Sequence, residues 1–406
     1  MKKRLITLLP CLALLASGCS SGGGDNTVTI NIWEDESNKE MVQHLAEEFV
    51  TEYRQHYDSE SAPKIEIVVT SQSEQSAMEE MTRGISESGN GPDIAAVTHD
   101  TIVSGYHGKI LAPASHADGL KYRMSEDALN AVTVEDQVYG YPITAESTTI
   151  MYDSSKVSAD ELASFDALLA SGKKLSWNLT GDNGGYYTFG LLNDATLFGE
   201  DGKDAKDVKL ATDQSTQNVL DFFTKYKDCF IDETPEDAVA SVTSGRTVGV
   251  VSAPYILTSM KKAVSSLKLA KLPAMGEQEL RPFSGYKAYV VSKYSKNGAI
   301  AQELCNYLTS ADANLYRLKK AGYLPALDLS NSEYSELVEE IQGSDESKAF
   351  ASSLEESIVM PNISEMSNFW KPMNNAMTKF KNNSASLTLA SVKADLVAVE
   401  NTLLGK

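Results

Sequence analysis

The pattern of apolar and polar residues over the first hundred positions predicts three strands separated by two helices. Strands alternate between apolar and polar residues or form a short apolar run, whereas helices carry an apolar residue at every third or fourth position. The predicted elements are, in chain order, 27–33 (strand), 37–53 (helix), 64–70 (strand), 76–85 (helix) and 94–97 (strand). Ser37 and Glu40 have the spacing of a capping box at the first helix. This order predicts an α/β fold with a mostly parallel sheet.

The same kinds of pattern continue through the rest of the chain. Further strands are expected at 148–152, 175–178, 247–251 and 288–292, and a helix follows around 300–308. Residues 181–185 predict a glycine-rich loop, and 199–210 an exposed hairpin that turns at Asp201-Gly202. Because parallel sheets bind ligands beyond the carboxyl ends of their strands, 33–36 and 97–100 are candidate parts of a site.

The first 25 residues have the layout of an export signal and a tether. Three basic residues precede an apolar stretch, 5–16, that is too short to cross a bilayer. The run Leu15-Ala16-Ser17-Gly18-Cys19 resembles a lipoprotein signal, which predicts a signal peptide at 1–18 and acylation of Cys19. A diacylated cysteine anchors stably, and 19–25 would hold the folded chain within about 15 Å of the membrane. An ordinary secreted protein is the alternative.

Composition narrows the choice of partners and cofactors. The chain has 406 residues, which suits two or three domains, and a formal net charge of −20, which repels nucleic acid. Apart from Cys11 in the signal and the acylated Cys19, only Cys229 and Cys305 remain; we expect two buried free thiols, with a disulfide as the alternative. The five histidines lack metal-ligand spacing, so neither a metal nor another cofactor is expected.

Three groups of motifs together resemble one known family. They are Gly91-Pro92-Asp93-Ile94 with His99-Asp100 and Gly105-Tyr106; Tyr141-Pro142-Ile143 with Glu146; and Met360-Pro361-Asn362-Ile363 with Met366-Ser367 and Phe369-Trp370. By their order and spacing, the chain resembles the cluster 1 extracellular solute-binding proteins of ABC importers, and most closely the maltose/maltodextrin-binding branch. The resemblance covers nearly all of the chain after Val28.

The resemblance implies a two-lobed, type II periplasmic-binding-protein-like fold, in which each lobe is a mostly parallel sheet flanked by helices. It implies lobe 1 at 26–143 and 288–335, lobe 2 at 144–287 and 336–406, and hinge crossovers that let the lobes close on a sugar. The implied partners are an oligosaccharide and the membrane subunits of an ABC permease. The protein would be a monomer on the outer face of the cell membrane, or in the periplasm of a Gram-negative host.

The resemblance also implies which residues bind the sugar. Aromatic side chains cover the apolar faces of sugar rings, and carboxylates accept hydrogen bonds from hydroxyls. The implied residues are Asp100, Glu146 and the more peripheral Glu80 as acceptors, Tyr186, Tyr255 and Trp370 as stacking aromatics, and Asp35 and Asn374 as further cleft residues. Core packing is the alternative for the aromatics, and a helix cap or a solvated charge for the carboxylates.

Three positions depart from the pattern of the maltose-binding branch. Val97 replaces an aromatic, and Thr101 and Asn374 replace cations. These departures weaken maltose as the ligand more than they weaken α-glucan oligosaccharides in general. A binding protein for a maltodextrin-like α-glucan, and not an enzyme, is therefore predicted. The alternatives are a binding protein for another oligosaccharide, a surface glycoside hydrolase, or a lipoprotein that adheres to polysaccharide or signals to a sensor kinase.

Overall fold

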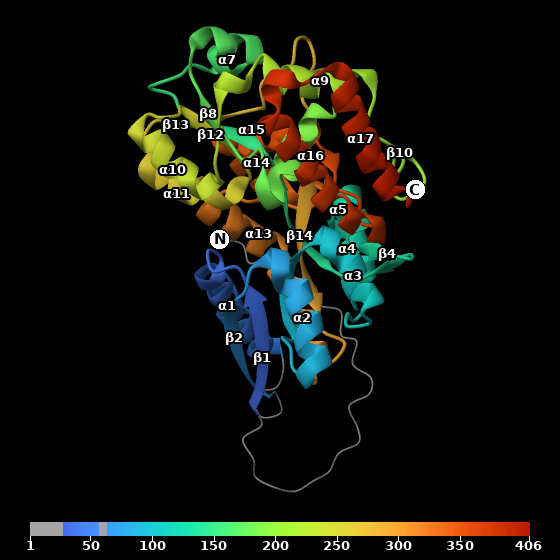
Figure 1. The fold of residues 1–406 in the computed structure, drawn as a ribbon. Helices are drawn as coiled ribbons and strands as arrows, with labels where there is room; N and C mark the ends of the chain where they lie inside the picture. The colour runs from blue at the N-terminus through green and yellow to red at the C-terminus, as the bar shows by residue number, and fades with distance from the viewer. Residues whose placement is uncertain (1–26, 57–62) are drawn as a thin grey trace, which may run out of the picture.

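Two β-sheets, one in each lobe, organise the fold (Figure 1). The structure, a computed structural model, describes residues 27–56 and 63–406. The larger sheet has the strand order β15-β6-β14-β3-β1-β2, with β16 also paired to β14. Its strands are β1 (Thr27–Glu34), β2 (Lys64–Ser71), β3 (Ile94–Thr98), β6 (Tyr141–Ser147), β14 (Phe283–Val291), β15 (Leu324–Pro325) and β16 (Ile358–Val359). The predicted α/β fold with two lobes is confirmed.

The first five predicted elements are all present, three as strands of the larger sheet and two as helices that pack on it. β1 pairs in parallel with both β2 and β3. The intervening helices are α1 (Lys39–His56) and α2 (Glu74–Ser88), whose buried residues pack on the sheet. The parallel opening is therefore confirmed, while β14 runs antiparallel between β3 and β6.

One prediction about α1 is wrong. The helix begins at Lys39, and both the amide and the hydroxyl of Ser37 donate to Asp35 Oδ1, at 3.0 and 2.7 Å. Ser37 therefore serves a turn that follows β1 instead of forming a capping box with Glu40. Such short-range bonds of serine and aspartate to their own neighbours compete with helix capping.

The second sheet has the order β11-β8-β12-β7-β13 and is mixed. Its strands are β7 (Thr149–Asp153), β8 (Leu175–Trp177), β11 (Phe230–Asp232), β12 (Gly249–Ser252) and β13 (Leu267–Ala270). β8 is parallel to β11 and β12, whereas β7 is antiparallel to β12 and β13. β6 of the larger sheet ends at Ser147, and β7 of the second sheet starts at Thr149. At this crossing, the buried Thr148 is the one residue between the two strands.

The remaining elements cover the two sheets or form short pairs. The helices are α3 (Ile102–His107), α4 (Ala117–Arg123), α5 (Glu126–Ala131), α6 (Ala159–Leu162), α7 (Phe165–Ser171), α8 (Gly184–Thr188), α9 (Asp213–Thr224), α10 (Pro235–Ser244), α11 (Leu257–Ala263), α12 (Gly298–Leu308), α13 (Ala311–Ala321), α14 (Ser335–Gly343), α15 (Asp345–Glu355), α16 (Trp370–Asn382) and α17 (Leu389–Leu403). The short pairs are β4 (Thr133–Val134) with β5 (Gln137–Val138), and β9 (Thr196–Leu197) with β10 (Val208–Lys209). The pair β9–β10 confirms a hairpin in the predicted region, although Phe198 and Leu210 at its base are buried.

The segment predicted as a glycine-rich loop is mostly helical instead. Gly181–Asn183 forms a 3₁₀ turn that continues directly into α8. A Cβ added to Gly184 would lie 2.7 Å from the carbonyl oxygen of Leu179, and one on Gly185 would lie 2.9 Å from Asn374 Oδ1. The two glycines are therefore needed for close packing against Leu179 and Asn374, a requirement that a sequence pattern does not reveal.

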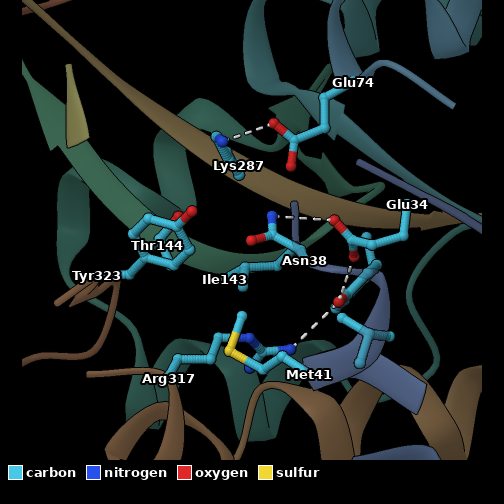
Figure 2. Close-up of a pocket in the computed structure, with 11 residues that line it drawn as sticks. Glu34, Asn38, Met41, Glu74, Ile143, Thr144, Lys287, Arg317 and Tyr323 are labelled. Atoms are coloured by element: carbon cyan, nitrogen blue, oxygen red, sulfur yellow. Dashed lines mark hydrogen bonds and ion pairs between the residues drawn. The ribbon is translucent and has the colours of Figure 1, made fainter. Parts of the chain in front are cut away.

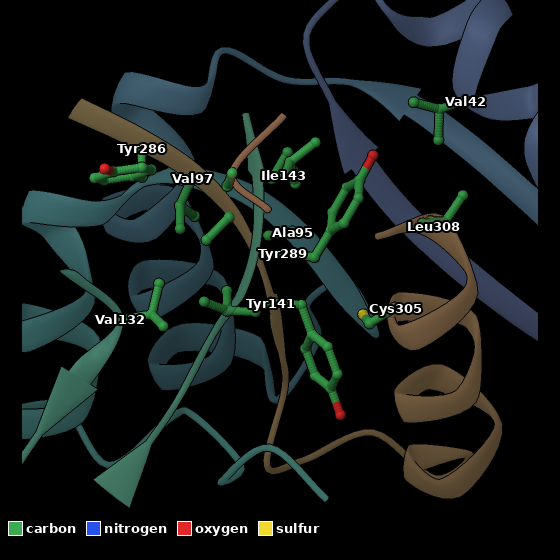
Figure 3. Packing of buried hydrophobic residues seen from close by; sticks show 14 of the residues in the cluster. Val42, Ala95, Val97, Val132, Tyr141, Ile143, Tyr286, Tyr289, Cys305 and Leu308 are labelled. Carbon is green, nitrogen blue, oxygen red and sulfur yellow. The ribbon is translucent and has the colours of Figure 1, made fainter. Parts of the chain in front are cut away.

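Two apolar clusters form the core. The cluster of the larger sheet includes Tyr141, Tyr289 and Cys305, which lie close together in Figure 3. The cluster of the second lobe is rich in aromatic rings, with Trp177 stacked on Phe165 at a centroid distance of 6.3 Å.

The cysteines and the membrane prediction can be compared with the structure only where it describes the chain. Cys229 and Cys305 are both buried and free, as predicted. Within 27–56 and 63–406, no helix is both long and apolar enough to cross a membrane. Cys19 and the signal lie outside the described residues, so the lipid anchor stays a prediction. The lobe boundaries at 143/144, 287/288 and 335/336 also stay a prediction.

Candidate functional site

Three predicted site residues from two lobes meet at one place. Asp100 lies in the 3₁₀ turn His99–Thr101 that directly follows β3, and Glu146 lies near the end of β6. Tyr186 comes from α8 in the second lobe. Burial, followed by the nearby charges of Glu146 and Asp100 among other groups, raises the pKa of the Tyr186 hydroxyl well above its ordinary value. Tyr186 of α8 thus lies near Glu146 of β6 and near Asp100 in the turn after β3.

The histidine before Asp100 has a structural role. His99 is fully buried, and its Nδ1 accepts a hydrogen bond from the Tyr286 amide at 3.1 Å. Its Nε2 lies 2.9 Å from the carbonyl oxygen of Met360, which fixes the tautomer with the proton on Nε2. The ring therefore joins the end of β3 to β14 and to the segment after β16. Asp100, half-buried, is held at the rim of this junction.

The predicted aromatics form a partly exposed layer on two buried rings. Tyr186, Tyr255 and Trp370 are each half-buried, whereas Tyr187 and Phe283 beneath them are buried. The ring centroid of Phe283 lies 6.2 Å from those of Tyr186 and Trp370. The Tyr187 hydroxyl oxygen lies 3.3 Å from that of Tyr255. This arrangement leaves aromatic surface free to cover a sugar ring.

Lys287, Glu74 and Glu146 form a largely buried ion-pair cluster. Lys287 on β14 is 12% exposed, and its Nζ lies 2.7 Å from Glu74 Oε2 and 3.8 Å from Glu146 Oε2. Figure 2 shows Lys287 and Glu74 facing each other above a cavity of about 10 Å³, which is room for one water-sized group. Burial opposes the charge of Lys287, but Glu146 and Glu74 outweigh it and raise its pKa well above the ordinary value. Lys287 is therefore a stable cation.

Glu34 occupies the other side of the same cavity. It is 2% exposed and accepts hydrogen bonds from the Tyr289 hydroxyl at 2.8 Å and from Asn38 Nδ2 at 3.3 Å (Figure 2). Arg317 Nη2 donates to the Tyr289 hydroxyl at 3.2 Å. Burial, reinforced by the negative charge of Glu74, raises the pKa of Glu34 to about 7.

The sequence contained signals for some of the residues that were missed. Glu34 continues the two-residue alternation of Ile30 and Ile32, which points it to the core side of β1. Glu74 occupies the first turn of α2, and three buried residues of that helix follow it at 77, 78 and 81. Lys287 carried no local signal, because only the return of β14 places it beside Glu146.

Other predicted site residues lie apart from the charged cluster or have partners already. Glu80 is on the outer part of α2, where its side chain is 33% exposed and pairs with Arg83. Asn374 accepts from the Gly185 amide at 2.6 Å and donates to the Asp182 carbonyl at 2.5 Å. Asp35 accepts from Ser37 in the turn after β1. The roles of these three residues in binding stay predictions.

The structure also accounts for two of the departures from the family pattern. Val97 is fully buried in the core of the larger lobe, where Figure 3 shows it, so it presents no surface to a ligand. The hydroxyl of Thr101 donates to the Thr98 carbonyl at 2.8 Å. Neither residue supplies the aromatic ring or the cation that the maltose-binding branch has there.

A polar pocket of about 420 Å³ opens beside Trp370. Its other lining residues are Gly181, Asp182, Lys371, Asn374, Asn375 and Thr378. The pocket combines an indole ring with hydrogen-bonding groups, the two kinds of surface that a sugar requires.

Comparison with known proteins identifies the family. A profile of bacterial extracellular solute-binding proteins matches residues 48–340, which is more than half of the chain. The chain belongs to this family. A maltooligosaccharide ABC transporter solute-binding lipoprotein of Streptococcus pneumoniae is 24% identical to this solute-binding protein, over 92% of this chain and 88% of the relative.

Two further similar proteins were found by sequence and by structure. A galactooligosaccharide-binding protein of Bacillus subtilis is 23% identical, over 94% of this chain and 88% of the relative. The solved structure of a maltodextrin binding protein, MalE1 of L. casei BL23, without ligand, superposes with a TM-score of 0.77 at 17% identity, over 93% of this chain and 99% of that chain. The structural match establishes the shared two-lobed fold.

Proposed function

We propose that this solute-binding protein captures maltodextrin-like α-glucan oligosaccharides between its two lobes and delivers them to the membrane subunits of an ABC importer. The observation that carries the proposal is that Tyr186, in the predicted second lobe, lies near Asp100, in the predicted first lobe, and near Glu146 of β6. A sugar bound there would contact both lobes and so favour their closure.

The contacts in this region suit an oligosaccharide. Glu146 and Asp100 would accept hydrogen bonds from sugar hydroxyls, and an ionised acceptor strengthens such bonds. The half-buried Tyr186, Tyr255 and Trp370 would cover ring faces. Micromolar affinity, about −8 kcal/mol, would allow both capture and release. No step in this mechanism requires the protein to cleave the sugar.

Isothermal titration calorimetry with maltose, maltotriose and maltotetraose tests the proposal. We expect saturable binding at one site per chain, and chromatography of the same mixtures should show only intact sugar. Cleavage of the sugar would overturn the proposal in favour of a hydrolase. The absence of binding to all three α-glucans would overturn the choice of ligand.

A different oligosaccharide is the second candidate, because a relative of nearly equal identity is named for galactooligosaccharides. Adding a β-linked galactooligosaccharide to the same titration distinguishes the two. Preference for the galactooligosaccharide would keep the binding role and change the substrate.

The lipid anchor at Cys19 is part of the proposal. It would keep the protein on the outer face of the membrane, within reach of its transporter. The support comes from the signal in the sequence and from relatives that are named lipoproteins. Labelling of the expressed protein with radioactive palmitate should mark the wild type and not Cys19→Ala. Equal labelling of both would contradict acylation at this cysteine.

A further inference from the structure

The ion-pair cluster of Lys287, Glu74 and Glu146 contains one lysine between two nearly buried carboxylates. The side chains of Lys287, Glu74 and Glu146 are 12, 7 and 19% exposed, and they come from β14, α2 and β6. The lysine is closer to Glu74, at 2.7 Å, than to Glu146, at 3.8 Å. Of the three, Glu146 keeps the most exposed surface. It can therefore accept a bond from a ligand while the lysine holds it from the side of the protein.

The charges around Lys287 are mostly negative. Titratable groups face the cluster from every element packed against it. They are Glu34 of β1, Glu74 of α2, Asp100 after β3, Glu146 of β6, Tyr186 and Tyr187 of α8, Arg317 of α13, and Tyr323 in the segment after α13. Arg317 donates to the Leu308 carbonyl and to the Tyr289 hydroxyl, so its guanidinium is already engaged. Within the described chain, Lys287 is the one cation that forms an ion pair with Glu146.

Burial favours the neutral form of Glu146, and the lysine opposes it. Burial raises the pKa of Glu146, Lys287 lowers it and Glu74 adds a smaller increase, so that the pKa lies above its ordinary value but lower than it would without the lysine. Removal of the lysine would leave Glu74 and Glu146 as neighbouring buried carboxylates with no cation between them. Glu146 would then keep its proton up to a higher pH than in the wild type, because the charge that lowers its pKa is gone.

We propose that Lys287 is a positioning residue that keeps Glu146 charged and fixed in orientation, so that Glu146 can accept hydrogen bonds from the hydroxyls of the bound sugar. The inference rests on the proposed function, because it takes Glu146 as a sugar acceptor. A purely structural role is the competing explanation. Buried ion pairs are often no more stabilising than apolar residues of the same size, so stability alone does not explain the lysine.

The test compares Lys287→Met with wild type in the full-length protein. Methionine keeps most of the length of the side chain and removes the charge, and Lys287→Gln serves as a second neutral variant should the first not fold. Maltotetraose binding is titrated calorimetrically between pH 5.5 and 8. In the ligand-free protein, the ionisation of Glu146 is followed by NMR of its labelled side-chain carboxyl carbon, assigned with Glu146→Gln.

We expect the affinity of the wild type to fall less between pH 8 and pH 5.5 than that of the neutral variants. The neutral variants should lose about tenfold in affinity at pH 5.5 relative to pH 8, because a charge-assisted hydrogen bond becomes a neutral one. The NMR titration should show a higher pKa for Glu146 in the variants. Lys287→Arg should restore both the affinity and the pKa.

Two controls separate positioning from structure. Lys319→Met removes a lysine that is 47% exposed and pairs with Glu336 and Glu340 on the surface. It should change neither the affinity for maltotetraose nor the pKa of Glu146. Glu74→Gln leaves the cation beside Glu146 and should keep the pH profile of the wild type. If Glu74→Gln reproduced the loss seen in Lys287→Met, the lysine would act through Glu74 and the inference would be overturned.

The remaining outcomes keep the inference and the proposed function apart. Equal affinity and an equal pH profile in wild type and Lys287→Met would overturn the inference while the proposed function stands. If the wild type does not bind maltotetraose, the choice of ligand in the proposed function fails. The NMR titration still decides whether Lys287 lowers the pKa of Glu146, and an unchanged pKa would overturn the inference there as well.

Discussion

Glu34→Gln should stabilise the protein much more at pH 8 than at pH 5. Glu34 is 2% exposed, and its pKa in the folded chain is raised from an ordinary 4.5 to about 7, first by burial and then by the charge of Glu74. Between pH 4.5 and about pH 7, Glu34 is protonated in the folded chain and ionised in the unfolded chain. Stability therefore falls as the pH rises through this window.

The size of the effect follows from the two pKa values. One pKa unit corresponds to about 1.4 kcal/mol, so the carboxylate of Glu34 destabilises the folded state by about 3 kcal/mol above pH 7. A glutamine has nearly the same shape and stays neutral. Its oxygen can accept from Asn38 Nδ2, as Glu34 Oε1 does at 3.3 Å, and its NH₂ group can donate to the Tyr289 hydroxyl. The substitution removes the charge, keeps the hydrogen bond from Asn38 and reverses the direction of the one with Tyr289.

Equilibrium urea unfolding at pH 5, 6, 7 and 8 measures this effect. The free energy of unfolding of Glu34→Gln minus that of wild type should grow from about 1 kcal/mol at pH 5 to about 3 kcal/mol at pH 8. Glu80→Gln is the matched control on the same lobe, and it should show no growth because Glu80 is 33% exposed and pairs with Arg83 at the surface. If the difference in free energy of unfolding between Glu34→Gln and wild type stayed the same from pH 5 to pH 8, the reasoning would be refuted.

Three further predictions follow from the site and the core. Trp370→Ala should weaken maltotetraose binding about a hundredfold and lower the melting temperature by only about 3 °C, since the indole is half-buried; a large loss of thermal stability would instead mark the ring as core. Asn374→Ala should destabilise the segment 181–188 by about 1–2 kcal/mol, seen as faster hydrogen exchange there, because two backbone groups lose their partner; unchanged exchange would show that the amide is dispensable. Cys229 and Cys305 should not react with a thiol reagent at pH 8 until the chain is unfolded, because burial raises the pKa of Cys229 to about 11 and that of Cys305 well above its ordinary value; rapid labelling of the native protein would contradict their burial.

The sequence predicted most of the regular elements because their patterns are local. The strands β1, β2 and β3 and the helices between them each carry a periodicity within about ten residues, and their order implied the parallel pairing that is observed. The errors had two causes, a short-range hydrogen bond at Ser37 and long-range packing against Asn374 at residues 184–188. Ser37 bonds to Asp35 instead of capping α1, and residues 184–188 form a helix where the glycines suggested a loop.

The candidate site was partly predictable for a similar reason. Asp35 and Asp100 follow two strands of one parallel sheet, so the strand pattern alone predicts that they lie near the same edge of it. The positions of Tyr186 and Trp370 came from the family resemblance. The residues beneath them, Tyr187 and Phe283, are buried aromatics that could not be distinguished from ordinary core residues in the sequence.

By itself, the sequence determined the α/β class, the order of elements, the acidic surface and the residue types that could contact a sugar. Only the tertiary structure decided that Lys287 lies opposite Thr98 and Thr144 in the sheet and so reaches both Glu74 and Glu146. Those partners lie between 140 and 215 positions away along the chain. The physical reason is that periodicity and propensity act over a few residues, whereas the charge state of a buried carboxylate depends on which distant strand folds back beside it.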